Sequence, residues 1–476
     1  MIPIVEYPSI VMSATPWFED VYTSPQLKNF QTYVSGLILS PVHTISYMNS
    51  IFYAHYDQSA LNNFITDSSW SDEEFEDARY KYILEGIRRC EKDTDGKGIL
   101  ILDDTLSHHE SAKHMEFAGK FFDHSDSSYT WAHDVVTSHL VKGRLSVPLS
   151  FEIYLKKDQL NSEEYLASIA RRRDEGEDIK RILESESFKT KNDIARELVS
   201  KAFQRDIPFS YAIGDSAFLN FETVTVIESL KKSWIFGCKS DRVVQMPGQW
   251  MHLSDWAAKS IPKEKFKPVS VWYEKKKHVF WCYAANLVMR SLGERRIRVV
   301  VTYDNKELEG DPHFYCSNEI DWDSYKVLSL YAKRWRIDAS YRDSKQNLGL
   351  EDYEMRKLRG ARRHISMVFT AYALLVLGSA FAVTAASDDS HQQKKKEEAA
   401  PASSSPKLSN NIKVAKAEAC LTQTIGSKCR TVCTEALTAL LDVAFRIAAK
   451  VGKCDPKWLA QMLTSSKTML QKSAKV

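Results

Sequence analysis

The chain has 476 residues, enough for two or three domains, and its composition is that of a globular protein. Its 65 basic and 62 acidic side chains leave a formal charge of only +3. This balance excludes a uniformly basic nucleic-acid coat, so any polyanion must bind to local patches. Eight scattered cysteines do not resemble a disulfide framework, and the N-terminus lacks the pattern of a secretory signal. We therefore expect a cytoplasmic protein with reduced thiols.

Residues 1–95 are expected to be mostly helical. A helix over Gln26–Leu39 should be broken by a Ser-Pro pair, a second helix begins near Thr44, and Ser71–Glu74 forms a capping box for a third. Such a region could bind DNA ends. A helical lid packed on the rest of the chain is an equal alternative, because no clear helix-turn-helix pattern is present.

The pattern changes at Gly98. Gly98–Leu102 is an apolar run typical of a strand buried on both faces, and it ends in Asp103-Asp104. A pair of acids at the end of a buried strand is costly unless it binds something. Two long strands, His133–Val141 and Leu145–Leu155, are then predicted to form a hairpin.

A second predicted strand is also followed by an acidic residue. Lys191–Arg205 is expected to form an amphipathic helix that leads into the apolar strand Phe209–Ile213, which is followed by Asp215. A helix over Glu222–Lys231 and a strand over Trp234–Cys238 complete this part. Two strands thus carry a carboxylate at their C-terminal ends, where ligands bind in sheets with parallel neighbours.

Residues 241–320 change to alternating, aromatic-rich strands, which we interpret as a β-rich insertion. Trp272 and Trp281 lie in two of these strands. We favour core packing for both over stacking on a nucleic-acid base, because alternating aromatic residues usually pack a sheet face.

The stretch Tyr331–Lys345 is expected to form one uninterrupted helix, with Asp321 or Asp323 as a possible N-cap. Its spacing puts Asp338 on one face between an aromatic residue, an arginine and a lysine. Residues 324–364 contain eleven Lys or Arg and five Asp or Glu. This short region is therefore more positive than the whole chain.

The uncharged segment Ile365–Ser387 is long enough to span a membrane, but its polar residues and many alanines favour a buried core helix. Residues 387–411 are predicted to be a low-complexity linker, and residues 412–476 a tail of two or three short helices. The spacing of the tail cysteines, Cys420 to Cys454, is not a tight zinc pattern, so structural thiols are favoured.

Two strand acids and one helix acid, far apart in sequence, are what an RNase H-like fold brings together to hold two divalent metals. Carboxylates favour Mg²⁺ or Mn²⁺. In-line attack on a phosphodiester requires one metal to activate the nucleophilic oxygen and a second, ~4 Å away, to stabilise the leaving oxygen. Arg334 and Lys345 would then hold the phosphate backbone.

These residues carry a resemblance to a known family. The pattern Tyr331-x2-Arg334-x3-Asp338-x6-Lys345, followed by Gln346-Asn-Leu-Gly-Leu350, resembles the signature of DDE transposases from bacterial and archaeal insertion sequences. Asp104-Thr105 and Gly214–Phe218 resemble the first and second acidic motifs of that family. The similarity spans about residues 20–385.

The resemblance implies an α/β fold with an RNase H-like catalytic core in two parts, 96–240 and 321–386, interrupted by the β-rich insertion at 241–320. It implies magnesium-dependent cleavage and strand transfer at the ends of a mobile element, two Mg²⁺ (or Mn²⁺) ions, double-stranded DNA as the partner, a homodimer in the DNA complex and a nucleoid-associated location. The implied metal ligands are Asp104, Asp215 and Asp338. The implied DNA contacts are Tyr331, Arg334, Lys345, Arg342 and Arg356.

The family usually has Glu where this chain has Asp338, whose carboxylate therefore lies one bond length, ~1.5 Å, further back. Reduced or absent activity is one consequence, with Glu351 or Glu354 as substitutes outside the motif. Asp103 is the alternative to Asp104, because the strand register decides which of the pair points at the metals. The alternatives to a cut-and-paste transposase are a two-metal nuclease, an inactive domesticated DNA-binding relative and, from another class, a membrane-anchored protein.

Overall fold

The computed structural model describes residues 4–53, 57–90, 96–109, 114–174, 176, 188–397 and 423–451. The chain divides into two compact units. The first, here called the helical unit, contains residues 1–95, 109–118 and 341–476. The second, the sheet unit, contains residues 96–108 and 119–340.

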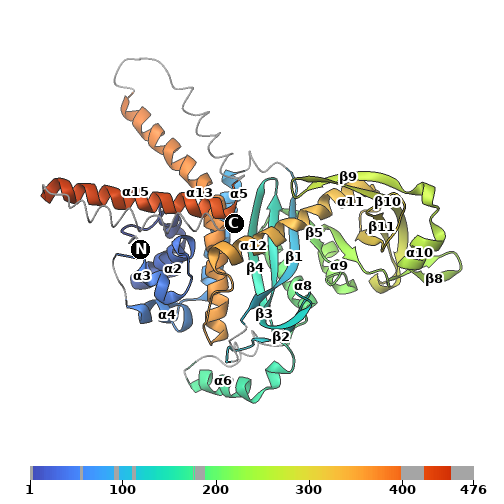
Figure 1. The fold of residues 1–476 in the computed structure, drawn as a ribbon, viewed down its shortest axis with the longest axis horizontal. Helices are drawn as coiled ribbons and strands as arrows, with labels where there is room; N and C mark the ends of the chain where they lie inside the picture. The colour runs from blue at the N-terminus through green and yellow to red at the C-terminus, as the bar shows by residue number, and fades with distance from the viewer. Residues whose placement is uncertain are drawn as a thin grey trace. The chain divides into compact units, whose positions relative to one another are not determined.

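The N-terminal part of the helical unit is built from helices, as predicted (Figure 1). The helix start predicted near Thr44 and the cap predicted at Ser71 are confirmed: these side chains accept hydrogen bonds from the backbone nitrogens of Tyr47 and Glu74. The elements are α1 (Ser9–Ala14), the 3-10 helix η1 (Thr15–Phe18), α2 (Ser24–Leu39), α3 (Ile45–Ser50), α4 (Gln58–Thr66) and α5 (Asp72–Arg89).

Helix α13 (Leu358–Glu397) is the centre of this unit, since it packs against α1, α2, α4 and α5. Ile365, Val368 and Leu374 on this helix are fully buried, which confirms the prediction of a core helix for the part whose side chains are described. The helix continues beyond Ser387 to Glu397, into the predicted linker. In the part of the chain that the structure describes, no helix is both long and apolar enough to cross a membrane.

The described part of the tail is one 27-residue helix, α15 (Ile425–Val451), rather than several short ones. The remainder of the predicted linker, Cys420 and Cys454 lie outside the described residues. The six cysteines within the described residues form no disulfide with one another: Cys90, Cys238, Cys282, Cys316, Cys429 and Cys433.

The sheet unit is one mixed sheet with the strand order β2-β3-β1-β5-β6-β12-β11-β10-β7-β8; β4 pairs with β3, and β9 with β10. Strand pairs β1–β5 and β5–β6 are parallel, and the other ladders are antiparallel. The strands are β1 (Gly98–His108), β2 (Gly119–Asp123), β3 (Ser128–Lys142), β4 (Leu145–Tyr154), β5 (Phe209–Gly214), β6 (Ser233–Cys238), β7 (Val243–Met246), β8 (Gln249–His252), β9 (Lys267–Tyr273), β10 (Lys276–Met289), β11 (Arg295–Tyr303) and β12 (His313–Ser317).

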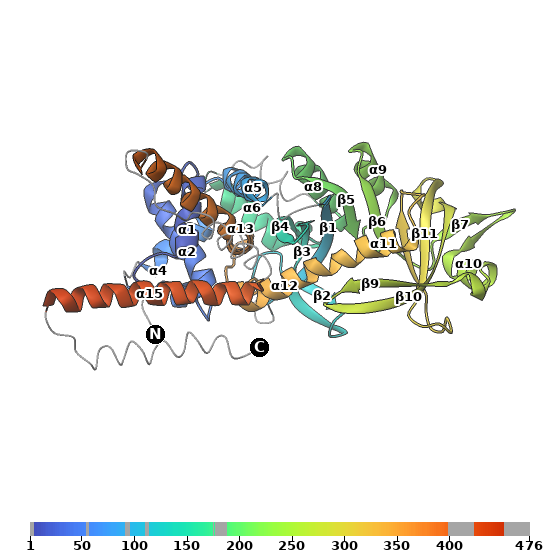
Figure 2. The ribbon, with the colours of Figure 1, turned by 90° about the horizontal axis from the view of Figure 1, so that it is seen from above.

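Helices cover both faces of this sheet (Figure 2). Helices α8 and α9 lie on one face, and α11 lies on the other. The helical elements of the unit are η2 (Gln159–Asn161), α6 (Glu163–Asp174), α8 (Lys191–Gln204), α9 (Phe221–Ser229), α10 (Leu253–Ser260), η3 (Lys263–Lys265), η4 (Arg290–Leu292) and α11 (Ser324–Tyr331). The predicted α/β class, with core strands and a β-rich addition, is confirmed.

The β-rich region extends the core sheet. Strand β12 pairs antiparallel with the core strand β6, with Phe314 opposite Cys238, and β11 and β10 follow in order. Backbone hydrogen bonds therefore continue from the core into residues 241–320.

Strand β1 does not end at the two acids, as the sequence suggested, but continues to His108. What ends there is its parallel ladder with β5, whose last pair is Leu102 with Gly214, while the antiparallel ladder with β3 continues. The apolar run thus coincides with the part of β1 that pairs with strands on both sides. Asp103 and Asp104 lie just beyond that point.

The predicted uninterrupted helix is also wrong. Helix α11 ends at Tyr331, a 3-10 turn η5 covers Ala332–Arg334, and helix α12 (Trp335–Leu348) follows. Asp323 accepts a hydrogen bond from the Lys326 nitrogen and caps α11, as expected. Good helix formers allow either geometry, and short 3-10 turns are common next to α-helix ends.

The expectation of core packing is wrong for Trp272, which is 72% exposed on β9. Its neighbour Val271 is buried, and β9 packs on α11 and η5, so alternation along the strand directs Trp272 outward. Trp281 is half-buried.

Candidate active site

The end of the β1–β5 ladder brings two acids together. Leu102 pairs with Gly214 in parallel register, so the next residues, Asp103 and Asp215, follow on adjacent strands and on the same face. The Asp215 carboxylate accepts a hydrogen bond of 2.8 Å from the Ala217 nitrogen, which fixes its orientation. The register therefore favours Asp103 as the partner of Asp215.

Asp103 is a buried acid in a negative environment, only 9% exposed. Burial raises its pKa to about 7; the nearby Arg334 opposes this shift, and the carboxylates of Asp104, Asp338 and Asp215 add to it. Neighbouring negative charges disfavour the ionised form of a carboxyl group, so these acids lie near enough to Asp103 to affect its pKa. The β1–β5 register and the contacts of Arg334 likewise place acids from three distant parts of the chain near one another.

Arg334 supplies the positive charge in this cluster. Its guanidinium donates a hydrogen bond to the Asp103 carboxylate and lies 3.7 Å from that of Asp338. Burial alone would lower its pKa, but the acids, Asp103 first, raise it. Arginine thus stays charged and acts as an internal counter-ion for the acids.

Tyr331 lies beside the same cluster and is half-buried. Burial, opposed by the nearby Arg334, raises its pKa to about 12, and the charges of Asp215 and Asp103 contribute. Its ring packs 4.6 Å from that of Tyr315, and a Cβ on Gly237 would be only 3.1 Å from its hydroxyl oxygen. Glycine at 237 therefore leaves the room that this hydroxyl occupies.

Asp338 is the most open of these acids, with a side chain that is 45% exposed. It lies in the first turn of α12, one helical turn after Arg334. Asp103, Asp215 and Asp338 thus combine a buried, a half-buried and an exposed carboxylate around one guanidinium.

Asp104 points to the opposite face of β1, as alternation requires. Its carboxylate pairs at 2.9 Å with the Lys191 ammonium, which also pairs at 2.6 Å with Asp134 on β3. Sequence reasoning missed Asp134 and Lys191. The available signal was Asp134 itself, a charged residue within the predicted strand His133–Val141.

The other predicted DNA contacts belong to the helical unit. Lys345 pairs at 2.6 Å with Glu351, one of the two substitutes considered for the third acid. Arg342 and Arg356 are exposed. Within the sheet unit, positive charge also gathers near Lys333, whose pKa is lowered by burial and then by Arg336 and Lys326.

Two protein-family models match this chain. The one described as DDE superfamily endonuclease matches residues 18–270, just over half of the sequence, and the one described as Transposase DDE domain matches residues 189–374. The chain belongs to the DDE superfamily of endonucleases. None of the curated proteins with which it was compared matches it.

The matched residues contain the whole acid cluster of this DDE endonuclease. Asp103, Asp104 and Asp215 lie in the first match, and Asp215, Arg334 and Asp338 lie in the second. The chain is therefore a nuclease or transposase enzyme, and the resemblance to DDE transposases is confirmed at that level. The finer signature and the aspartate in the third position stay predictions.

The donors of this DDE endonuclease suit a hard divalent cation, because they are carboxylate oxygens. The arrangement of these donors in the structure does not suit such a cation. Among the described residues, no group of three His, Cys, Asp or Glu side chains is placed to hold a metal ion. The Arg334 guanidinium instead contacts Asp103. Arg334 thus offsets part of the negative charge of these acids.

Proposed function

We propose that the protein is a metal-dependent transposase that cleaves DNA at the ends of an insertion sequence and transfers the freed 3′-hydroxyl ends into target DNA. The observation that supports this proposal is the arrangement of three acids: the strand register puts Asp103 beside Asp215, and Arg334 contacts Asp103 and lies 3.7 Å from Asp338. Three acids from distant parts of a DDE domain, set beside a cation that can bind phosphate, suit phosphodiester chemistry.

In this proposal Asp215 and Asp338 hold metal together with one acid of β1. The strand register supports Asp103 for that role, and the motif resemblance supports Asp104. Two Mg²⁺ (or Mn²⁺) ions would activate the attacking oxygen and stabilise the leaving one. The protein's own part is to hold these carboxylates at fixed positions and to bring the DNA backbone to them.

Arg334 has two roles here. Without DNA it neutralises Asp103, and with DNA its planar guanidinium can turn to a phosphate, which it binds in a bidentate manner. The double-stranded DNA would also contact Tyr331, Lys345, Arg342 and Arg356. The exposed Trp272, next to Lys277 across the β9–β10 ladder, offers a surface on which a base could stack.

The test uses supercoiled plasmid with Mg²⁺ or Mn²⁺. The wild-type chain should convert it to nicked and linear forms, and Asp215→Asn should not. Asp255→Asn is the matched control, because Asp255 is an exposed acid on α10 of the same unit, away from the cluster. Equal cleavage by wild type and Asp215→Asn would refute the proposed role of these acids.

A second candidate is a nuclease or an inactive DNA-binding relative, and the observation that favours it is the short side chain at Asp338. An oligonucleotide with a free 3′-hydroxyl separates the two. Covalent joining of this oligonucleotide to the plasmid supports the transposase, whereas nicking without joining supports the nuclease. Inactive wild-type protein with an active Asp338→Glu variant would indicate a decayed transposase.

We also propose that two chains act together, because both ends of an element must be processed in one reaction. Sedimentation of the protein with end-containing DNA should give a complex with two chains. Inverted repeats flanking this reading frame would support the insertion-sequence context.

A further inference from the structure

The face of β1 opposite Asp103 carries a second carboxylate pair, Asp104 and Asp134. In the antiparallel β1–β3 ladder Asp104 lies opposite Val136 and Asp134 lies opposite Leu106, so the two acids are diagonal neighbours on one face. The side chain of Asp104 is 29% exposed and that of Asp134 only 1%. One acid of the pair therefore reaches solvent and the other is enclosed.

The Lys191 ammonium lies between these acids and contacts both. Two carboxylates and one ammonium leave one negative charge uncompensated. The Oδ1 atom of Asp134 is enclosed and, in the described residues, has no hydrogen-bond partner. Burial raises the pKa of Asp134, and the charge of Asp104 raises it further, while Lys191 and then Lys156 oppose the shift. A buried oxygen with an unused lone pair, in a cluster with excess negative charge, is a position for a cation.

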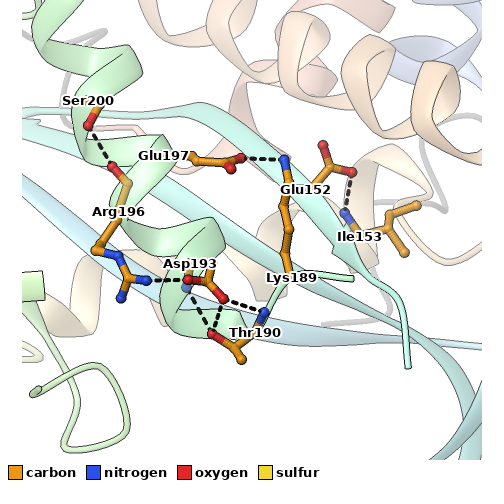
Figure 3. A network of polar contacts seen from close by, with 8 residues as sticks. All are labelled: Glu152, Ile153, Lys189, Thr190, Asp193, Arg196, Glu197 and Ser200. Atoms are coloured by element: carbon orange, nitrogen blue, oxygen red, sulfur yellow. Dashed lines mark hydrogen bonds and ion pairs between the residues drawn. The ribbon is translucent and has the colours of Figure 1, made fainter. Parts of the chain in front are cut away.

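The helix start that carries Lys191 is well anchored (Figure 3). Thr190 caps α8 through reciprocal hydrogen bonds with Asp193, and Lys189 pairs at 2.7 Å with Glu197. The backbone of Lys191 is thus fixed, while its side chain is 34% exposed. A flexible four-carbon stem lets the ammonium move between the acids and solvent without moving the helix.

We propose that Asp104 and Asp134 form a cation site whose resident occupant is the Lys191 ammonium, and that Mg²⁺ or Mn²⁺ enters when the ammonium withdraws. Both acids offer hard oxygen ligands, and such ions usually keep several waters, so two carboxylates suffice. This inference does not rest on DNA cleavage. It concerns the face of β1 that lies away from Asp215 and Arg334.

The experiment counts bound Mn²⁺ by electron paramagnetic resonance of the free ion, using full-length chains that also carry Asp215→Asn. That background removes an acid of the proposed catalytic cluster, so a failure of the catalytic proposal leaves this result unchanged. Lys191→Met should bind one more Mn²⁺, roughly tenfold more tightly than the lysine-containing chain, because a positive charge next to the acids is gone. Adding Asp134→Asn should abolish that gain.

Lys189→Met is the matched control, because Lys189 is a nearby lysine that pairs with Glu197 and lies outside the carboxylate pair. If Lys191→Met binds no more Mn²⁺ than Lys189→Met, the proposal is overturned. A second measurement needs no variant, in case Lys191→Met does not fold. In the wild-type chain, millimolar Mn²⁺ should raise acetylation of Lys191 several-fold by mass spectrometry and leave Lys189 unchanged; equal labelling of Lys191 with and without Mn²⁺ would also overturn the proposal.

Discussion

Asp103 and Asp104 are adjacent in strand β1 but have different neighbours on its two faces. Asp103 lies with acids from β5 and α12, and an arginine from the 3-10 turn before α12 neutralises it. Asp104 lies with one acid from β3, and a lysine from the start of α8 contacts both. The first face gathers Asp103, Asp215 and Asp338, whereas the second gathers Asp104 and Asp134. Adjacent acids in a strand are thus separate sites, because alternation directs them to different neighbours.

Substitution of single carboxylates is expected to give the largest difference in DNA cleavage between the two faces of β1. Asp215→Asn should lower DNA cleavage about 10³-fold or more, because it removes a ligand from the proposed catalytic site. Asp103→Asn should match that loss if the register identifies the first acid, and Asp104→Asn should then retain activity. Initial rates of plasmid nicking at saturating Mn²⁺ measure all three. The reverse order, with Asp104→Asn inactive and Asp103→Asn active, would show that Asp104 is the catalytic acid.

The length of the third acid gives the next largest effect. Asp338→Glu moves the carboxylate forward by one bond, and a 1 Å displacement in an active site can change the rate about 10²-fold. We expect cleavage to increase by roughly that factor if the structure around Asp338 still fits Glu. Asp343→Glu, on the same helix but in the helical unit, is the matched control and should leave the rate unchanged. A slower Asp338→Glu enzyme would indicate that the site has adapted to aspartate.

Much of this could be predicted from the sequence. The apolar runs before Asp103 and Asp215 correctly located two parallel strands, and the spacing from Tyr331 to Asp338 correctly predicted a helical acid near a cation. These signals are local, because burial and helical periodicity can be recognised from consecutive residues.

The rest depends on pairing partners that no local pattern specifies. The apolar run could not show that β1 continues past Asp104, since the extension is stabilised by the β3 ladder alone. Nor could it show which of the two acids faces Asp215, because a shift of register by one residue exchanges the faces. Lys191 lies 57 residues from Asp134 in the sequence, and its contact with Asp134 follows only from the packing of α8 against β3. The exposed Trp272 shows the same limit, because alternation does not say which face is covered.

The pH dependence of stability should also differ between the faces. The pKa of Asp103 in the folded, metal-free protein is raised to about 7, well above its ordinary value of 3.8, so the folded state binds a proton that the unfolded state has already lost. Between pH 4 and 7 this group therefore lowers the free energy of unfolding as pH rises, by at most about 1.4 kcal/mol per pH unit.

Asp103→Asn cannot titrate at this position, so its stability relative to wild type should improve steadily from pH 4 to pH 7. Urea unfolding in EDTA at several pH values measures the difference. Asp255→Asn is the control, since the pKa of that exposed acid is lowered by the hydrogen bond and charge of Lys259. A constant difference between wild type and Asp103→Asn across this range would contradict the raised pKa.

The smallest effect we expect concerns what holds Arg334 on the Asp103 face. The Tyr331 hydroxyl, enclosed near Gly237, shares its environment with Arg334 and Asp215, and the contact with Arg334 lowers its pKa against the effect of burial. Tyr331→Phe removes this single polar contact and should reduce the free energy of unfolding by about 0.5–1.5 kcal/mol. Tyr325→Phe is the matched control, because Tyr325 is an exposed tyrosine on α11 of the same unit. If Tyr331→Phe is as stable as this control and cleaves DNA at the wild-type rate, then the acids hold Arg334 without help from the tyrosine, and the counter-ion on that face depends on the acid cluster.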